Sequence, residues 1–272
     1  MIPWIRIIVA ILCTLVTPGC WRVDGEDDSK AVALWSAARW GEQQTVEREL
    51  AKGINVNARD NLGRTALHWA AQYGHEEVAE TLIAHGADVN ARSKGGYTPL
   101  DLAAGWVRGQ MVKTLLGHGA DINARDKLGW TPLHRIAAAD ESDMRGRTTE
   151  EHLDLVRLLL DHGADLHARD RDGCTPLIYA TLNRHHEAMK LLLDRGADVD
   201  GQSDQSTPLT IAVRSGNKDA VELLLGRGAD VYRKPRGRES ALELAQMLHT
   251  REGHTEILAM LKAHVVKAEK KH

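Results

Sequence analysis

Histidine is the residue of this chain that could most readily bind a metal or transfer protons, and it occurs fourteen times. His85, His118 and His162 each stand directly before a glycine, at separations of 33 and 44 residues. That spacing assigns each to a separate structural unit about 10 Å from the next, whereas metal ligands lie about 2 Å from their ion. His185 and His186 are adjacent and would point in different directions on a helix. We therefore expect structural histidines, with no metal and no cofactor.

Nucleophilic chemistry has equally little support. The sequence contains no GxSxG elbow, no HExxH helix and no P-loop. Cys174 is not accompanied by any recognisable base, so we interpret it as a lone thiol. The sequence predicts a protein that is not an enzyme and has no catalytic residues.

Composition indicates a soluble globular chain with a real core, since 43% of residues are hydrophobic and 27% are charged. The formal net charge is -3, and basic and acidic residues are mixed throughout. A broad positive field of the kind that dominates phosphate binding is therefore not expected. We predict that nucleic acid is not a partner.

The elements that position these residues repeat at a fixed period. Thr65, Thr98, Thr131, Thr175 and Thr207 open related segments at spacings of 33, 33, 44 and 32 residues. Each threonine can cap a helix, and the proline that follows most of them suits the first helical position. A second helix with one apolar stripe follows, and a glycine then supplies a left-handed turn. The pattern predicts an all-α chain of helix pairs.

The residues from Thr65, TALHWAAQYGHEEVAETLIAHGADVNARSKG, together with TPLDLAA, TPLHRIAA, TPLIYA and TPLTIAV, resemble the ankyrin repeat. The resemblance covers residues 31–264. It implies an ankyrin-repeat solenoid of about seven stacked helix-turn-helix repeats with β-hairpin-like fingers. The repeats would span 32–64, 65–97, 98–130, 131–174, 175–206, 207–239 and 240–264.

Two departures from the repeat predict local features. An insertion of 11 residues lies within 138–151, and the capping-box spacing of Thr148 and Glu151 predicts that the second helix of that repeat begins near Thr149. The first and last repeats carry Arg48, Glu49 and Lys262 on faces that are usually apolar, which is typical of solubilising end caps.

In the ankyrin family the finger tips and exposed first-helix positions contact partner proteins. The resemblance therefore implies a monomeric scaffold that binds a protein partner through a concave face, with aromatic and arginine anchors. For Trp106 and Trp130 the alternative is packing against neighbouring fingers, while Trp69 is expected in the core. The implied contact residues are Arg64, Tyr73, Lys94, Tyr97, Trp106, Lys127, Leu128, Trp130 and Arg171.

The N-terminus predicts export. Within residues 1–20, Arg6 precedes an apolar run from Ile7 to Val16 and then Thr-Pro-Gly, which is the order of regions in a signal peptide. The run is shorter than the roughly 20 residues of a membrane-spanning helix. An acidic tether over 21–30 and a charged tail over 265–272 flank the repeats.

Cys20, directly after Gly19, resembles the lipidated cysteine of bacterial lipoproteins and implies a bacterial host. Thr17 and Pro18 depart from that pattern, so lipidation of Cys20, simple cleavage and retention as an anchor remain open. We expect a periplasmic or membrane-anchored protein that touches the membrane only through this segment. The alternative function is a secreted effector or toxin-associated factor that uses the same repeats on a foreign cell.

Overall fold

The computed structural model describes residues 31–139, 148–201, 203–250 and 254–269. Within these ranges the regular structure is entirely helical, as predicted. The predicted signal segment, the acidic tether and most of the insertion within 138–151 lie outside the described residues. The helices form seven pairs: α3 (Val32–Trp40) with α4 (Gln43–Ala51), α5 (Ala66–Tyr73) with α6 (Glu76–Ala84), α7 (Pro99–Gly105) with α8 (Gly109–Gly117), α9 (Pro132–Ala138) with α11 (Thr149–Asp161), α12 (Pro176–Leu182) with α13 (His186–Asp194), α14 (Pro208–Arg214) with α15 (Lys218–Gly226), and α16 (Ala241–Leu248) with α17 (His254–Glu269).

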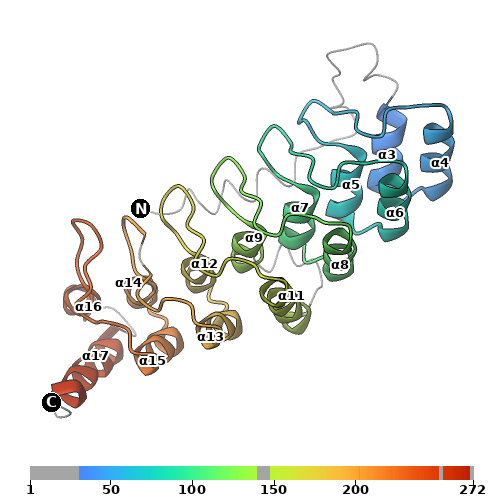
Figure 1. Cartoon of the computed structure of the whole chain (residues 1–272). Coiled ribbons are helices and arrows are strands. Elements are labelled where there is room, and N and C mark those ends of the chain that lie inside the picture. Colours follow the sequence, from blue (N-terminus) through green and yellow to red (C-terminus); the bar gives the residue numbers. More distant parts are fainter. Residues whose placement is uncertain (1–30, 140–147, 202, 251–253, 270–272) are drawn as a thin grey trace.

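The pairs stack into an elongated solenoid (Figure 1). The first helices form one row, in which each contacts the next from α3 to α16, and the second helices from α4 to α17 form a parallel row. The loops between pairs project from the stack on one side as fingers. Because each repeat packs only against its neighbours, the face of the fingers and first helices extends along the whole molecule.

Threonine caps begin α7, α9 and α14 as the sequence predicts, whereas the buried hydroxyl of Thr175 before α12 makes no hydrogen bond with the described residues. The Thr98 hydroxyl accepts a hydrogen bond from the Asp101 amide, and Thr131 and Thr207 cap α9 and α14 in the same way. Thr148 forms the expected capping box with Glu151, so α11 begins at Thr149 as predicted. These caps satisfy amides that would otherwise be unpaired at each helix start.

Each finger closes through a backbone hydrogen bond across its tip and pairs with the next finger. The Asp126 amide donates to the Trp130 carbonyl at 2.9 Å. Between fingers, the Lys94 amide donates to Leu62 at 2.8 Å, and the Arg171 amide donates to Leu128 at 2.9 Å. The fingers are thus hairpin-like, as predicted, and their mutual pairing keeps the tips in register.

The core is continuous along the stack and is built from one leucine per helix row in each repeat. Leu67, Leu100, Leu133, Leu177 and Leu209 of the first helices are at most 1% exposed. A matching leucine row in the second helices, from Leu82 to Leu224, is also buried. The last helix continues to Glu269, beyond the predicted end of the repeats at 264.

Buried histidines connect successive repeats. The His68 imidazole accepts from the Thr65 amide at 3.1 Å through Nδ1, and Nε2 contacts the Tyr97 carbonyl at 2.9 Å. These partners require a neutral ring with its proton on Nε2. His134 makes the same pair of contacts with Thr131 and the carbonyl of Cys174. These two histidines therefore belong to the fold itself.

Asp101 occupies the equivalent position in the third repeat, but its side chain makes fewer of the hydrogen bonds that His68 and His134 make there. Its Oδ2 accepts from the Thr98 amide at 2.8 Å, but its buried Oδ1 has no hydrogen-bond partner. Burial raises the pKa of Asp101 to about 6. We expect Asp101→His to raise the free energy of unfolding at pH 7 by about 1–2 kcal/mol, because it removes a buried charge and can reach the next finger. Urea denaturation monitored by circular dichroism measures this, and an unchanged or lower stability would contradict it.

Candidate functional site

Three of the fingers are each organised by one buried aspartate: Asp60, Asp126 and Asp170. Asp60 accepts from the Leu62 and Arg64 amides through Oδ1, at 2.8 Å each, and from the Trp69 indole through Oδ2 at 3.0 Å. Asp170 is bound in the same way, with the Tyr179 hydroxyl donating to Oδ2 at 2.6 Å. One carboxylate thus shapes the finger and also ties it to the first helix that follows it in the chain.

In the fourth repeat, the first-helix side chain that donates to the finger aspartate is the guanidinium of Arg135. Arg135 pairs with Asp126, whose carboxylate is completely buried. The Arg135 guanidinium also lies 4.6 Å from the ring centroids of both Tyr97 and Trp130. Trp130 in turn contacts Tyr179 at a centroid distance of 4.4 Å. We call Tyr97, Arg135, Trp130 and Tyr179 the aromatic column.

Several predicted contact residues are engaged within the stack. Trp106 and Trp130 are 7% and 6% exposed, which leaves little of either indole for a partner. Arg64 lies 5.0 Å from the Trp69 ring and donates to Gln72 at 3.0 Å. Tyr73 stacks on Trp69 at 6.4 Å. Arg64, Tyr73 and Tyr97 remain half-buried, so each still presents part of its side chain on the face, while Trp69 is in the core as expected.

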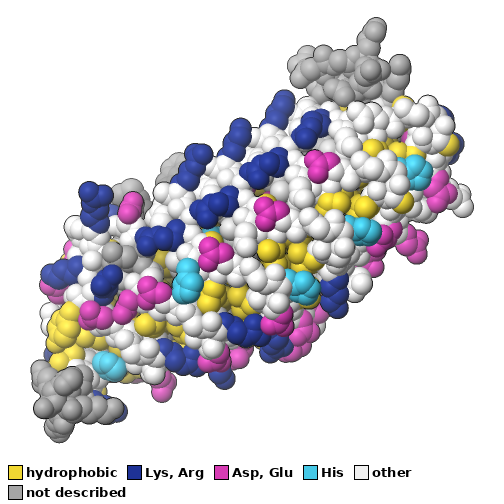
Figure 2. Space-filling model, in the orientation of Figure 1, with side chains coloured by type: hydrophobic (Ala, Val, Ile, Leu, Met, Phe, Trp, Pro, Cys, Tyr) yellow, Lys and Arg dark blue, Asp and Glu magenta, His cyan; other side chains and the backbone are white. Residues whose placement is uncertain are grey.

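The other predicted contact residues lie exposed at consecutive finger tips. Leu128 is 49% exposed, and Lys94, Lys127 and Arg171 are also exposed. Behind the tips runs a second set of exposed arginines, each of which donates to the carbonyl of its counterpart in the next finger. Figure 2 shows these cations as rows over the fingers. We call the two rows the basic finger edge: Arg59, Arg92, Lys94, Arg125, Lys127, Arg169 and Arg171.

The aspartates that shape the fingers are internal and do not offset the exposed cations around them. Asp60, Asp126 and Asp170 are 5%, 6% and 8% exposed and are bound by finger amides, whereas the cations reach solvent. The chain's net charge of -3 conceals this segregation. A surface of this kind attracts an acidic partner.

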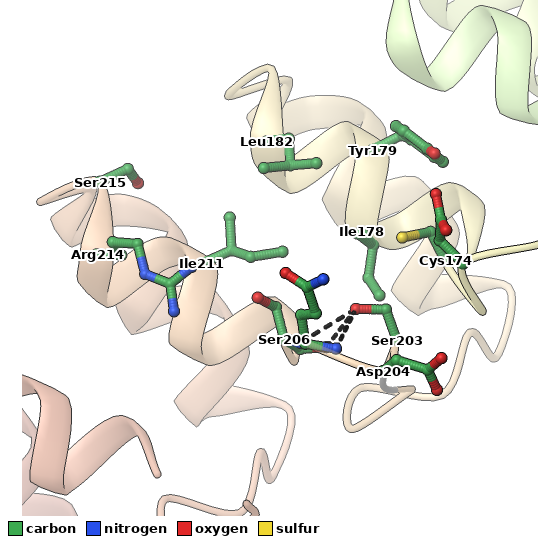
Figure 3. Close-up of a pocket in the computed structure, with 12 residues that line it drawn as sticks. Cys174, Ile178, Tyr179, Leu182, Ser203, Asp204, Ser206, Ile211, Arg214 and Ser215 are labelled. Atoms are coloured by element: carbon green, nitrogen blue, oxygen red, sulfur yellow. Dashed lines mark hydrogen bonds between the residues drawn. The ribbon is translucent and has the colours of Figure 1, made fainter. Parts of the chain in front are cut away.

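A cavity of about 310 Å³ opens between the fifth and sixth repeats (Figure 3). Ile178, Leu182 and Ile211 form its apolar floor, and it is bounded by α12, α14 and their fingers. It has the size and the largely apolar lining of a binding pocket. We call it the α12/α14 pocket.

Sequence reasoning missed this pocket, although two signals for it are present. The residue before the opening threonine is Tyr97 or Trp130 in the earlier repeats, but it is Cys174 and Ser206 here. The sixth finger is also one residue short. Small side chains on a shortened finger leave space that bulky rings fill elsewhere in the stack.

Cys174 and the histidines are the residues that could support nucleophilic or metal chemistry. Burial, followed by the charge of Asp170, raises the pKa of the Cys174 thiol to about 12, so the thiol is protonated at neutral pH and a weak nucleophile. No cluster of three potential metal ligands occurs among the described residues. The helices of the described ranges include none with the length and hydrophobicity to cross a bilayer.

Known proteins resemble this chain in its repeats. A family described as ankyrin repeats (3 copies) matches residues 10–93, 34–126 and 147–235. The crystal structure of the human ASB11 ankyrin repeat domain superposes with a TM-score of 0.67 and 29% sequence identity. That similarity covers 78% of this chain and 90% of the ASB11 domain. No curated protein matches the chain in sequence.

Proposed function

We propose, from the premise that this chain belongs to the ankyrin repeat family, that it is a non-enzymatic scaffold of the cell envelope that binds a partner protein. Ankyrin repeats are general protein-interaction modules. The proposed contact surface is the face of fingers and first helices over repeats two to five. The basic finger edge is the observation that carries this assignment, because it is exposed and continuous across four fingers.

The charge of this surface indicates the charge of its partner. Exposed cations in two rows favour a partner with an acidic surface, since complementary charge accelerates encounter and selects orientation. The exposed Leu128 at a finger tip adds an apolar contact among the cations. The half-buried Tyr73 and Tyr97 extend the contact toward the first helices.

Charge reversal at the finger tips tests this surface. We expect the triple variant Lys94→Glu, Lys127→Glu and Arg171→Glu to reduce partner capture from envelope extracts by roughly tenfold at low salt, and less at high salt. Quantitative mass spectrometry of the captured proteins measures the loss.

The matched control reverses three exposed lysines on second helices, Lys113, Lys190 and Lys262, so that the net charge change is nearly identical. The control variant should capture the partner normally, and both variants should show the wild-type circular dichroism spectrum. Equal losses in the two variants would contradict the assignment to the finger face.

The compartment belongs to the same proposal. The signal-like residues 1–20 support export to the periplasm or a membrane, with Cys20 as the candidate lipidation site. Mass spectrometry of the mature N-terminus tests this. An acylated Cys20 would support a membrane-anchored lipoprotein, whereas an intact Met1 would contradict cleavage. A cleaved, unmodified and released chain would favour the second candidate, a secreted effector or toxin-associated factor acting on a foreign cell.

A further inference from the structure

We propose that the α12/α14 pocket binds an aromatic side chain of the partner, presented next to a basic residue. The inference rests on the proposed function, because it takes the ligand to be a segment of a protein. It adds a specific anchor site in repeats five and six, beyond the face assigned to repeats two to five.

The ring preference follows from the aromatic column, which ends at the pocket. Along the column, the Arg135 guanidinium lies between the rings of Tyr97 and Trp130, and Trp130 contacts Tyr179. The next two equivalent positions toward the C-terminus hold Cys174 and Ser206, whose small side chains leave the space between finger and helix unfilled. A ring supplied by a partner would take the place that the chain's own rings occupy in the preceding repeats.

The pocket presents groups that suit a planar ring. Ile178, Leu182 and Ile211 provide an apolar floor, and Figure 3 shows Cys174 on one side of it and Arg214 on another. Arg214 is half-buried, and it forms no ion pair with any residue that the structure describes. A guanidinium near a ring contributes a cation–π attraction, and a thiol sulfur packs favourably at a ring edge.

Two carboxylates on the finger side of the pocket favour a basic residue next to the inserted ring of the partner. Asp172 and Asp204 both line it and are both exposed, and neither is engaged in an ion pair within the described residues. The two fingers are adjacent, since the Asp204 amide donates to the Asp172 carbonyl at 3.3 Å. A lysine or arginine beside the inserted ring would meet both carboxylates. Figure 3 shows Asp204 on the side of the pocket away from Arg214.

Peptide binding to the full chain tests the proposal. Three hexapeptides would be compared that differ only in a central pair, Lys-Trp, Lys-Ala or Glu-Trp, flanked by glycine and serine. The readout is the methyl NMR signals of Ile178, Leu182 and Ile211. We expect Lys-Trp to shift these signals saturably, with an affinity at least about threefold above that of Glu-Trp, and Lys-Ala to cause no saturable shift.

Substitutions of residues that line the pocket test whether the peptides bind there. Cys174→Tyr copies Tyr97, which precedes the opening threonine of the third repeat, so it should fill the pocket and abolish the shifts, while Cys174→Ala should retain them. Arg214→Gln should weaken the Lys-Trp peptide by at least about threefold through loss of the cation–π contact. Asp204→Asn should reduce the preference of the pocket for Lys-Trp over Glu-Trp.

Binding of Lys-Ala as strongly as Lys-Trp, or unchanged Lys-Trp binding to Cys174→Tyr, would overturn the proposal. Thermal denaturation of each variant establishes that it is folded. If the peptides fail while the finger-tip triple variant still loses partner capture, the pocket assignment is wrong and the scaffold function stands. If both fail, the proposed function fails with it.

Discussion

Lowering the pH from 6.5 to 4 should reduce the free energy of unfolding by roughly 3 kcal/mol through three buried groups alone. Burial lowers the pKa of His68 to about 4 and also lowers the pKa of His152 to about 4. Below pH 6.5 the unfolded chain protonates both rings, whereas the folded chain keeps them neutral. Each ring therefore costs about 3 kcal/mol by pH 4, because one pKa unit corresponds to about 1.4 kcal/mol.

Asp101 opposes this loss. Its pKa is raised to about 6, so the folded chain binds a proton between pH 6 and 4 that the unfolded chain does not, and this gain offsets about 3 kcal/mol. His134, whose pKa is lowered chiefly by burial, acts in the same direction as His68 and His152. The histidines outweigh the aspartate, and the chain should be most stable near or above neutral pH.

Urea denaturation at half-unit steps from pH 4 to 7.5 measures this dependence. His152→Gln should flatten the curve, because the amide can still donate to the Ile136 carbonyl that His152 contacts at 2.8 Å but does not titrate. Asp101→Asn should steepen the curve, because the opposing group is removed. A stability that is constant or rises on acidification would refute these assignments.

Replacing Arg135 by leucine should cost about 3–5 kcal/mol of stability, because it leaves the buried carboxylate of Asp126 without its cation. The loss also removes the guanidinium from between Tyr97 and Trp130. Elsewhere in the stack, the equivalent two positions hold neither the carboxylate nor the cation. In the finger that precedes the third repeat, the residue equivalent to Asp126 is Ser93, whose hydroxyl accepts from the Tyr97 amide at 3.0 Å. The residue equivalent to Arg135 in the first helix of the third repeat is Leu102, whose side chain is not a donor.

The double variant Asp126→Ser with Arg135→Leu therefore imports the pairing of the third repeat into the fourth, and it should recover most of the loss. The single variant Asp126→Ser completes the cycle and should be destabilised as well, since Arg135 then keeps a half-buried charge without its carboxylate. Urea denaturation of all four proteins gives the coupling energy, which we expect to exceed about 1 kcal/mol. Additive losses would show that aspartate and donor act independently.

The fold could be predicted almost completely from sequence, because a repeat places the same physical signals many times. The Thr-Pro-Leu openings, the glycine after each second helix and the capping box at Thr148 are local, and each acts within a few residues. The order of the helix pairs then follows from stacking between neighbours.

The surface was less predictable, because burial depends on contacts between repeats. Trp130 occupies an outward position by pattern, but Arg135 and Tyr179 from neighbouring segments cover it. The α12/α14 pocket arises from small residues at Cys174 and Ser206, which matter only because the surrounding repeats leave their space unfilled. Net charge likewise averages over the chain and hides the separation between exposed cations and buried aspartates.

Site-specific photo-crosslinking tests the central claim, that a partner protein binds the face of fingers and first helices. A photoreactive amino acid would replace Tyr73 or Leu128 on this face and Lys113 or Lys190 on the second helices, each in the otherwise native full chain in its own cells. We predict one discrete cross-linked protein from positions 73 and 128 and none from 113 and 190. The same product from the second-helix positions, with none from the finger face, would contradict the account.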